Sequence, residues 1–431
     1  MAEKSEYCEH ILLSRVDLEN STSIDVYLKS GGYETLKKTV SGRQPQEIVD
    51  VVRESGLRGR GGAGFPAGVK WGFLPKDSKL PIYLIGNADE GEPGTFKDRV
   101  LIEKDPHQLI EGMAITAFAI KCHTAYIYIR GEFAKGAKIL NKAIDEAYEK
   151  GFLGDKVCGT DFKFDIYVHR GAGAYVCGEE TALIESIEGK KGQPRLKPPF
   201  PANVGVFQGP TIVNNVETLS SVPWIVKNGA EAYRKYGTEK SAGTKLFCVS
   251  GHVEKPGVYE LPLGFPLMQL VNEVCGGVKD GKKLKGVIPG GSSTPILTPE
   301  ECENVNLDYE SLMEAGSMLG SGAVIVLDET VDIVRVAARL GKFYSHESCG
   351  QCTPCREGSG YISGLLQRLN EGKGEEGDLE LIESLCDNMA GKTVCPLADA
   401  MVMPVKGFLK KFRSEFEARI RKKAYQKADK G

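Results

Sequence analysis

The sequence predicts an α/β domain with a parallel sheet in its first half, a small β-rich segment after it, and a helical C-terminal region. Three observations lead to this fold class. Apolar runs of strand length alternate with helical segments from residue 80 to residue 219. Short strands separated by turn residues follow from 244 to 330. From Val331 onward, apolar residues recur with the period of a helix.

The composition is that of an ordinary globular protein. A chain of 431 residues has room for about two to four domains, with 41% hydrophobic and 26% charged residues. The net charge of -3 gives no reason to expect a nucleic-acid partner. The first six residues lack a signal-peptide pattern, and the apolar run 113–120 is too short to span a bilayer. We therefore expect a cytoplasmic protein without direct membrane insertion.

The N-terminal part leads into a glycine-rich loop. Residues 22–40 and 45–55 are predicted to be two packing helices. The loop that follows, 56–66, matches G-x-G-x-x-G formally, but a helix precedes it and Pro66 closely follows, so a strict dinucleotide-binding turn is not expected. Its glycines would let backbone N–H groups approach a phosphate, and Arg58, Arg60 and Lys70 add positive charge. The alternative is a flexible surface loop.

The predicted sheet contains three strands separated by helices. The strands are expected at 80–86, 125–129 and 162–168, with helices at 106–121 and 134–150. The first strand ends in the acidic loop 87–94, where ligands of open α/β sheets bind, although a solvated turn explains the same residues. The third strand runs into a second glycine turn, 169–183, which is followed by a helix start that would face an anion. Two such loops on one sheet predict a composite site for a large, phosphate-bearing ligand.

Two further loops belong to this first half. The proline-rich stretch 192–201 would present Lys197 and Phe200. After 211–213, either Asn214 or Asn215 would cap the next helix, and either amide could instead bond a ligand.

The middle segment predicts a compact ββαβ unit. Strands are expected at 245–253, 258–261 and 323–327, with a short helix at 267–275. The loop 289–293 could bind phosphate, but a plain turn is favoured.

The most specific motif is a set of cysteines. Cys349, Cys352 and Cys355 are spaced C-x2-C-x2-C, and a distant Cys395 is followed by Pro396, as in ligation of a 4Fe-4S cluster. A zinc site with four thiolates normally uses two separated C-x2-C pairs, and a disulfide is unnecessary in a chain of this length. Cys386 competes for the fourth place but sits in a helical pattern, where a buried structural thiol is expected.

Helices surround these cysteines. They are expected at 331–340, 362–369, 379–389 and 397–416, with an exposed linker at 372–377. The basic stretch 419–423 is expected to be a solvated helix end.

Together these motifs closely resemble one family, the flavoprotein NADH-binding subunit of respiratory complex I. The resemblance rests on 56–71, the loop 87–95, 173–181, 214–218 and the cysteine cluster, in the same order along nearly the whole chain. It implies a Rossmann-like domain that binds FMN (1–240), a ubiquitin-like β-grasp domain of the SLBB type (241–330) and a four-helix bundle that holds one 4Fe-4S cluster (331–431).

The resemblance also implies residue roles. The FMN cradle would be formed by Gly59, Arg60, Gly61, Gly62, Lys70, Asn87, Asp89, Glu90, Tyr175, Gly178, Glu179, Val213, Asn214, Asn215 and Thr218. The NADH side would be lined by Phe65, Phe73, Glu92, Glu180, Lys197 and Phe200, with rings stacking on adenine and carboxylates on ribose. Glu92 is the candidate for positioning the nicotinamide.

The implied function is NADH oxidation by hydride transfer to FMN, with electrons passing singly to the cluster. The family's partners are a thioredoxin-like 2Fe-2S subunit and a large iron-sulfur subunit, through which the chain would lie at the inner membrane. Two alternatives stay open. One is the diaphorase subunit of an NAD-linked hydrogenase or formate dehydrogenase, and the other is a zinc-stabilised interaction module without redox activity.

Overall fold

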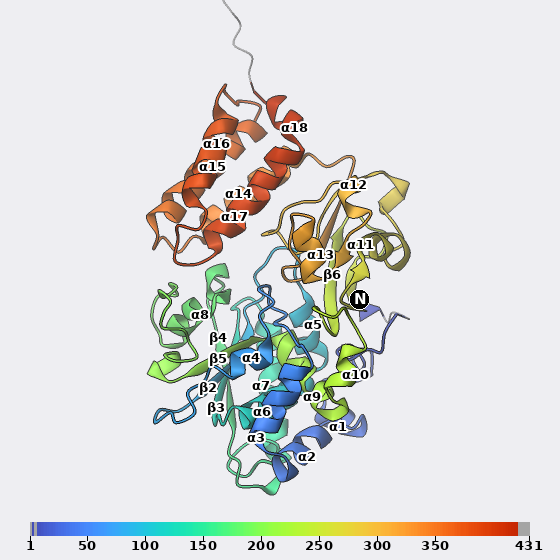
Figure 1. The fold of residues 1–431 in the computed structure, drawn as a ribbon, viewed down its shortest axis with the longest axis vertical. Coiled ribbons are helices and arrows are strands. Elements are labelled where there is room, and N and C mark those ends of the chain that lie inside the picture. The colour runs from blue at the N-terminus through green and yellow to red at the C-terminus, as the bar shows by residue number, and fades with distance from the viewer. Residues whose placement is uncertain (1, 4–6, 421–431) are drawn as a thin grey trace, which may run out of the picture.

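The structure is a computed structural model and describes residues 2–3 and 7–420. The α/β part and the strand-rich middle part lie together, and the C-terminal helices form a separate layer at one end (Figure 1). In addition to the helices and strands described below, short 3-10 turns occur at Val157–Gly159, Tyr175–Gly178, Val206–Gln208 and Lys279–Gly281.

The N-terminal segment contains more helices than the sequence predicts. The helix expected at 22–40 is wrong as one element, because it forms α1 (Ile24–Lys29) and α2 (Glu34–Gly42). Between them, Gly31 has φ +82° and Tyr33 has φ +61°, a left-handed conformation that ends a helix. The second predicted helix is confirmed as α3 (Pro45–Glu54), which starts at Pro45 and is followed by α4 (Ala67–Trp71).

A four-stranded sheet forms the centre of the α/β part. Its strands run in the order β4-β3-β2-β5, and every pairing is parallel. They are β2 (Tyr83–Ala88), β3 (Thr124–Ile129), β4 (Asp165–Arg170) and β5 (Thr211–Asn215). The chain moves outward from β2 to β4 and then returns to the other side of β2. The strand order therefore reverses between β2 and β5, which is where open α/β sheets bind their ligands.

Helices cover this sheet. They are α5 (Lys97–Lys104), α6 (Pro106–Ala119), α7 (Ala134–Glu149), α8 (Glu180–Ile187), α9 (Val216–Asn228) and α10 (Ala230–Arg234). The helix α6 is buried almost throughout and packs closely on α9, because a Cβ at Gly112 would lie 2.0 Å from the carbonyl oxygen of Leu219. The sequence does not predict α5, whose mixed charged residues lack a clear apolar stripe.

The middle part contains a five-stranded sheet with the order β1-β7-β6-β11-β9. Its strands are β1 (Ala2–Glu3), β6 (Thr244–Gly251), β7 (Gly257–Pro262), β9 (Leu284–Ile288) and β11 (Ala323–Asp328). The three predicted strands are confirmed, and β1 and β9 are additions. Smaller elements are β8 (Phe265–Pro266), β10 (Asn306–Leu307), α11 (Leu267–Gln269), the π-helical turn Leu270–Val274, α12 (Pro299–Cys302) and α13 (Tyr309–Glu314).

Within the described residues of the C-terminal part, which end at 420, four long helices pack together and a short one follows. They are α14 (Ile333–Glu347), α15 (Thr353–Asn370), α16 (Asp378–Met389), α17 (Leu397–Lys411) and α18 (Arg413–Glu417). The prediction of one helix from 397 to 416 is wrong, because the helix ends at Lys411. Of the predicted basic end, Arg419 pairs with Asp332 at 2.6 Å, and residues 421–423 lie outside the described part of the chain.

Candidate functional site

The carboxyl end of β2 meets the second glycine turn. The side-chain amide of Asn87 donates to the carbonyl of Gly178 at 2.9 Å, and the Asp89 N–H donates to Asn87 Oδ1 at 3.0 Å. Three predicted cradle residues from two segments are thereby brought together at the point where the strand order reverses.

The Asp89 side chain has an unsatisfied hydrogen-bond acceptor. Its Oδ2 is buried and has no hydrogen-bond partner among the described residues. Burial raises the pKa of Asp89 to about 7, against the nearby charge of Arg130, which lowers it. A buried carboxylate oxygen without a partner costs free energy, and a ligand hydroxyl such as those of a ribityl chain would satisfy it.

Glu90 has a structural partner of its own. Its carboxylate accepts the N–H groups of Asp98 at 2.8 Å and Arg99 at 3.1 Å, in the first turn of α5. Burial raises the pKa of Glu90 to about 7, and the charge of Asp98 adds to this. The acidic loop is therefore anchored, and is not merely a solvated turn.

The first glycine loop lies across the start of α9. The Gly59 N–H donates to the Phe65 carbonyl at 2.8 Å, and the Arg60 N–H donates to Thr218 Oγ1 at 2.9 Å. A Cβ at Gly61 would lie 3.2 Å from the Asn215 Cβ, whereas one at Gly62 would meet open space. Gly62 has φ +139°, so glycine is favoured there for backbone reasons. The loop presents bare backbone beside the end of β5, as close approach of a phosphate requires.

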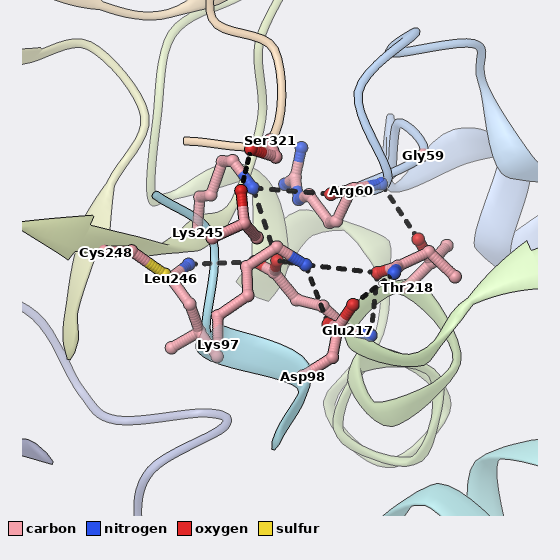
Figure 2. A network of polar contacts seen from close by, with 12 residues as sticks. Gly59, Arg60, Lys97, Asp98, Glu217, Thr218, Lys245, Leu246, Cys248 and Ser321 are labelled. Carbon is pink, nitrogen blue, oxygen red and sulfur yellow. Dashed lines mark hydrogen bonds and ion pairs between the residues drawn. The ribbon is translucent and has the colours of Figure 1, made fainter. Parts of the chain in front are cut away.

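A buried ionic network supports the loop from beneath (Figure 2). Glu217 Oε2 lies 2.8 Å from Lys97 Nζ and 3.2 Å from Lys245 Nζ, and Glu217 Oε1 accepts the Leu246 N–H at 2.8 Å. The three charged side chains are at most 1% exposed. Burial would raise the pKa of Glu217, but Lys245 and Lys97 outweigh it and lower the pKa. Burial lowers the pKa of Lys245 to about 8.

The network continues into the predicted cradle through Asn215. This residue caps α9 by accepting the Glu217 N–H at 2.9 Å, and it donates to Asp98 Oδ2 at 2.6 Å. Lys97 Nζ lies 2.7 Å from Asp98 Oδ1 and 3.3 Å from Asn215 Oδ1. Of the two asparagines, Asn215 is thus the cap, and Asn214 accepts from Trp71 Nε1 at 2.8 Å.

The guanidinium groups of both loop arginines bind other groups of the protein. Arg60 is fully buried, and its Nη2 donates to Tyr233 Oη at 3.0 Å and to the carbonyls of Ala242 and Thr244. Arg58 bonds to the Gly64 carbonyl and to Glu310, both at 2.7 Å. Arg60 therefore contributes to the loop through its backbone, because its guanidinium lies under the domain surface.

Lys70 and Lys197 converge on the start of α8. Lys70 Nζ lies 2.8 Å from Glu180 Oε2 and donates to the Val213 carbonyl at 2.9 Å. Lys197 Nζ lies 2.8 Å from Glu179 Oε1 and 3.2 Å from Glu180 Oε1. Glu179 also caps α8 with its other oxygen. Four charged residues and the Val213 carbonyl, all predicted and from four segments, form one cluster here.

Three predicted aromatic rings are exposed. Phe65 is 47%, Phe73 55% and Phe200 54% exposed, and the first two rings have centroids 5.9 Å apart. Stacking of a flat ligand on an exposed ring is favourable, because it removes apolar surface from water. This fits the role on adenine that is expected for these rings.

Glu92 is held from several sides. Its Oε2 accepts from Tyr175 Oη at 2.5 Å, and its Oε1 accepts from Ser292 Oγ at 3.1 Å and from the Ser293 N–H at 2.7 Å. The Tyr175 ring also contacts Phe343, with centroids 5.3 Å apart. The loop 289–293 is therefore more than a plain turn, since Ser292 and Ser293 bind the Glu92 carboxylate.

The four predicted cysteines line one cavity at the end of the helical layer. Cys349, Cys352, Cys355 and Cys395 surround it, together with Ser348, Gln351, Thr393, Val394, Leu397, Val176 and Pro194. Two polar groups also contact the thiols, the Val394 N–H at 3.4 Å from Cys352 Sγ and Ser348 Oγ at 3.3 Å from Cys355 Sγ. Hydrogen bonds to sulfur of this kind tune iron-sulfur clusters.

Cys386 is not part of this lining. It is fully buried within α16, and burial raises the pKa of its thiol to about 12, as for an inert structural cysteine. Within residues 2–3 and 7–420, no three His, Cys, Asp or Glu side chains are arranged to hold a single metal ion. The four thiols instead share a cavity, which is the arrangement that a larger cluster requires.

The residues present fit both cofactors. Four cysteine thiols around one cavity form the donor set of a 4Fe-4S cluster. The partnerless Asp89 oxygen and the open backbone at Gly62 fit a ligand with hydroxyl and phosphate groups.

The sequence does not predict the roles of Lys97, Glu217 and Lys245. A charged residue without a recognisable motif around it is normally expected to be exposed to solvent.

Comparison with known proteins agrees with these sites. The Nuo51 FMN-binding domain matches residues 52–224, the SLBB domain residues 245–336, and the NADH-ubiquinone oxidoreductase-F iron-sulfur binding region residues 335–419. An NADH-quinone oxidoreductase F subunit of Rhizobium meliloti is 52% identical over 96% of this chain and 98% of its own. The mitochondrial NADH dehydrogenase [ubiquinone] flavoprotein 1 of Dictyostelium discoideum is 51% identical over 92% of this chain and 84% of its own.

A solved structure is also similar. An NAD+-reducing [NiFe]-hydrogenase in its air-oxidized state matches with a TM-score of 0.83 and 36% identity, over 96% of this chain and 67% of that one. In the described residues, none of the helices combines the length and the apolar character needed to cross a bilayer. The identity over nearly full length and the three domain matches lead to one conclusion: the chain belongs to the family of NADH-quinone oxidoreductase F subunits, oxidoreductase components with an FMN-binding domain and a 4Fe-4S region.

Proposed function

We propose that this chain is the electron-input subunit of an NADH-quinone oxidoreductase and uses the residues described above to hold FMN, NADH and one 4Fe-4S cluster. When bound, FMN accepts a hydride from NADH, and the cluster takes up electrons one at a time. The protein contributes binding, orientation and the electrostatic surroundings.

On the flavin side, the backbone from Gly59 to Gly62 and the N-terminus of α9 form the phosphate end of the cradle. Asp89 accepts a hydrogen bond from a ligand hydroxyl through its buried, partnerless oxygen. The network of Lys97, Glu217 and Lys245 holds the loop and the helix start in place. On the NADH side, Phe65 and Phe73 stack on the adenine.

One observation supports the coupling of the two sites above all others. Val176 lines the cysteine cavity, and its neighbour Tyr175, a residue of the predicted FMN cradle, donates to Glu92 on the NADH side. The cradle and the cavity are thus joined by consecutive residues of the chain.

The finer assignments belong to the same proposal. The middle part is a ubiquitin-like β-grasp domain, the helical part is a four-helix bundle, and the boundaries lie near residues 240 and 330. The partners are a thioredoxin-like 2Fe-2S subunit and a large iron-sulfur subunit, which hold the chain at the inner membrane from the cytoplasmic side. The names of the relatives support an assembly of this kind.

The test is chemical analysis and spectroscopy of the anaerobically purified chain. We expect one FMN and four iron atoms per chain, and visible absorbance that bleaches when NADH is added. A colourless protein that contains zinc would refute the proposal.

The second candidate is the diaphorase subunit of an NAD-linked hydrogenase, to which the solved hydrogenase chain points, with less support than the first candidate has, at 36% identity over 67% of that chain against 52% over 98% of the F subunit. The proteins that copurify with the chain from its own cells decide between the two. Complex I subunits support the first candidate, and a hydrogenase subunit supports the second.

A further inference from the structure

The loop 289–293 of the middle part is built around the carboxylate of Glu92. Ser292 Oγ donates to Glu92 Oε1 at 3.1 Å, and the Ser293 N–H donates to the same oxygen at 2.7 Å. The loop is tied to the neighbouring backbone as well, since the Ser292 N–H donates to the Pro93 carbonyl at 3.2 Å. Residues 200 positions apart in the sequence are therefore joined at one side chain.

Gly291 allows this close approach. Its φ of +98° lies in the region that favours glycine, and a Cβ there would lie 2.7 Å from Glu92 Cγ and 2.9 Å from Glu92 Oε1. Any side chain at this position would collide with Glu92. The loop conformation and the position of the carboxylate are thus mutually dependent.

A third segment of the chain completes the arrangement. Tyr344 Oη, on α14, lies 2.9 Å from Ser292 Oγ, and its side chain is fully buried. The same helix leads directly into Cys349. A chain of hydrogen bonds therefore runs from the helical part through Ser292 to Glu92, and Tyr175 binds Glu92 from the other side.

We propose that Ser292 and Tyr344 are positioning residues that set the orientation of Glu92 for nicotinamide binding. This inference rests on the proposed function of Glu92. The hydroxyl of Ser292 holds Glu92 Oε1, and Tyr344 holds the hydroxyl of Ser292. The middle and helical parts thereby determine substrate affinity at a site whose other walls come from the α/β part.

The test uses the holoprotein, with FMN and iron measured in every variant. Ser292→Ala and Tyr344→Phe are compared with the wild type by steady-state NADH oxidation with ferricyanide and by calorimetric titration of the oxidised protein with NAD+. We expect Ser292→Ala to raise KM for NADH and to weaken NAD+ binding by about tenfold, equal to about 1.4 kcal/mol, because it removes a hydrogen bond to the charged carboxylate. Tyr344→Phe should change both in the same direction by a smaller factor, because Tyr344 acts on Glu92 through Ser292. The kcat should stay within about twofold, because the reacting groups are untouched.

Ser317→Ala is the matched control. Ser317 is a buried serine of the same part of the chain, and its hydroxyl donates to the Pro295 carbonyl at 2.6 Å without touching Glu92. It should leave both KM and NAD+ binding unchanged. In a Glu92→Gln background, Ser292→Ala should add little to the effect of Glu92→Gln alone, because both changes act through the same carboxylate.

The outcomes separate this proposal from the one on which it rests. If Glu92→Gln weakens NAD+ binding while Ser292→Ala and Tyr344→Phe do not, the positioning role is refuted and Glu92 keeps its assignment. If Glu92→Gln has no effect, the assignment of Glu92 fails and the positioning role fails with it. Loss of FMN or iron from both variants would also overturn the proposal, in favour of a purely structural role.

Discussion

Glu217→Gln tests the buried network most sharply. In the wild type, the carboxylate faces Lys97 at 2.8 Å and Lys245 at 3.2 Å, and all three side chains are at most 1% exposed. Glutamine keeps the size of the side chain and can still accept the Leu246 N–H, but it removes the negative charge between two ammonium groups. Removing one partner of a buried ion pair costs about 3–5 kcal/mol, so we expect the free energy of unfolding to fall by that amount.

The loss should also depend on pH. Burial lowers the pKa of Lys245 to about 8 in the folded wild type, against 10.5 for the ordinary group. Between these values the unfolded chain binds more protons than the folded one, so the contribution of Lys245 to stability rises with pH. Without Glu217 the folded pKa of Lys245 falls further, because Glu217 raises it. The decrease in the free energy of unfolding caused by Glu217→Gln should therefore be smaller at pH 9 than at pH 7.

Urea unfolding measures this change. The fluorescence of Trp71 and Trp224, both in the α/β part, reports the unfolding of the segment that carries Glu217. Glu310→Gln is the control, since its pair with Arg58 at 2.7 Å is 21–27% exposed and should be worth less than about 1 kcal/mol. A loss for Glu217→Gln no larger than that of the control would refute the reasoning.

The remaining predictions concern the cysteines, Asp89 and Gly291. Cys395→Ser should lose most of the bound iron and Cys386→Ser should retain it, as measured by iron analysis, because Cys386 lies outside the cavity. In the FMN-free protein, folded Asp89 keeps its proton between pH 3.8 and about 7 while the unfolded chain loses it. Stability should therefore fall as pH rises through this range, and Asp89→Asn should flatten that dependence in urea titrations. Gly291→Ala should lower stability by about 1–2 kcal/mol through its positive φ and should raise KM for NADH by displacing Glu92, as unfolding and steady-state kinetics would detect.

The strands and the cysteine set follow well from local patterns. Apolar runs placed β2 and β3 within a few residues of their observed bounds, because a buried parallel strand is largely apolar along its length. The edge strand β4 is less buried, and its predicted start lies three residues before the observed one at Asp165. The C-x2-C-x2-C spacing and the distant Cys395 identified a set that lines one cavity. The strands and the first three cysteines are patterns among sequence neighbours, and Cys395 was identified by the proline that follows it.

The helix break at Tyr33 and the unpredicted helix α5 show where local preference misleads. The break between α1 and α2 depends on the left-handed Tyr33, a conformation that its residue type does not indicate. The helix α5 buries the charged residues Lys97 and Asp98, so its pattern resembles that of an exposed loop. In both places the rest of the fold overrides the preference of the residues themselves.

The supporting contacts of the site could not be predicted. The buried ionic network joins three separate segments through Lys97, Glu217 and Lys245. From sequence alone, each of these residues is expected to be a charged side chain exposed to solvent. Glu92 and Ser292 lie 200 positions apart. Such pairs are decided by how the parts of the chain pack, and no local pattern carries that information.

Electron transfer between the two cofactor sites is the central claim, and electron paramagnetic resonance tests it most directly. The anaerobic holoprotein is reduced either with excess NADH or with dithionite, and the signal of the reduced cluster is compared. Because Tyr175 and Val176 join the flavin cradle to the cysteine cavity, NADH should produce the same cluster signal as dithionite. A cluster that NADH leaves oxidised while the flavin absorbance bleaches would contradict the account.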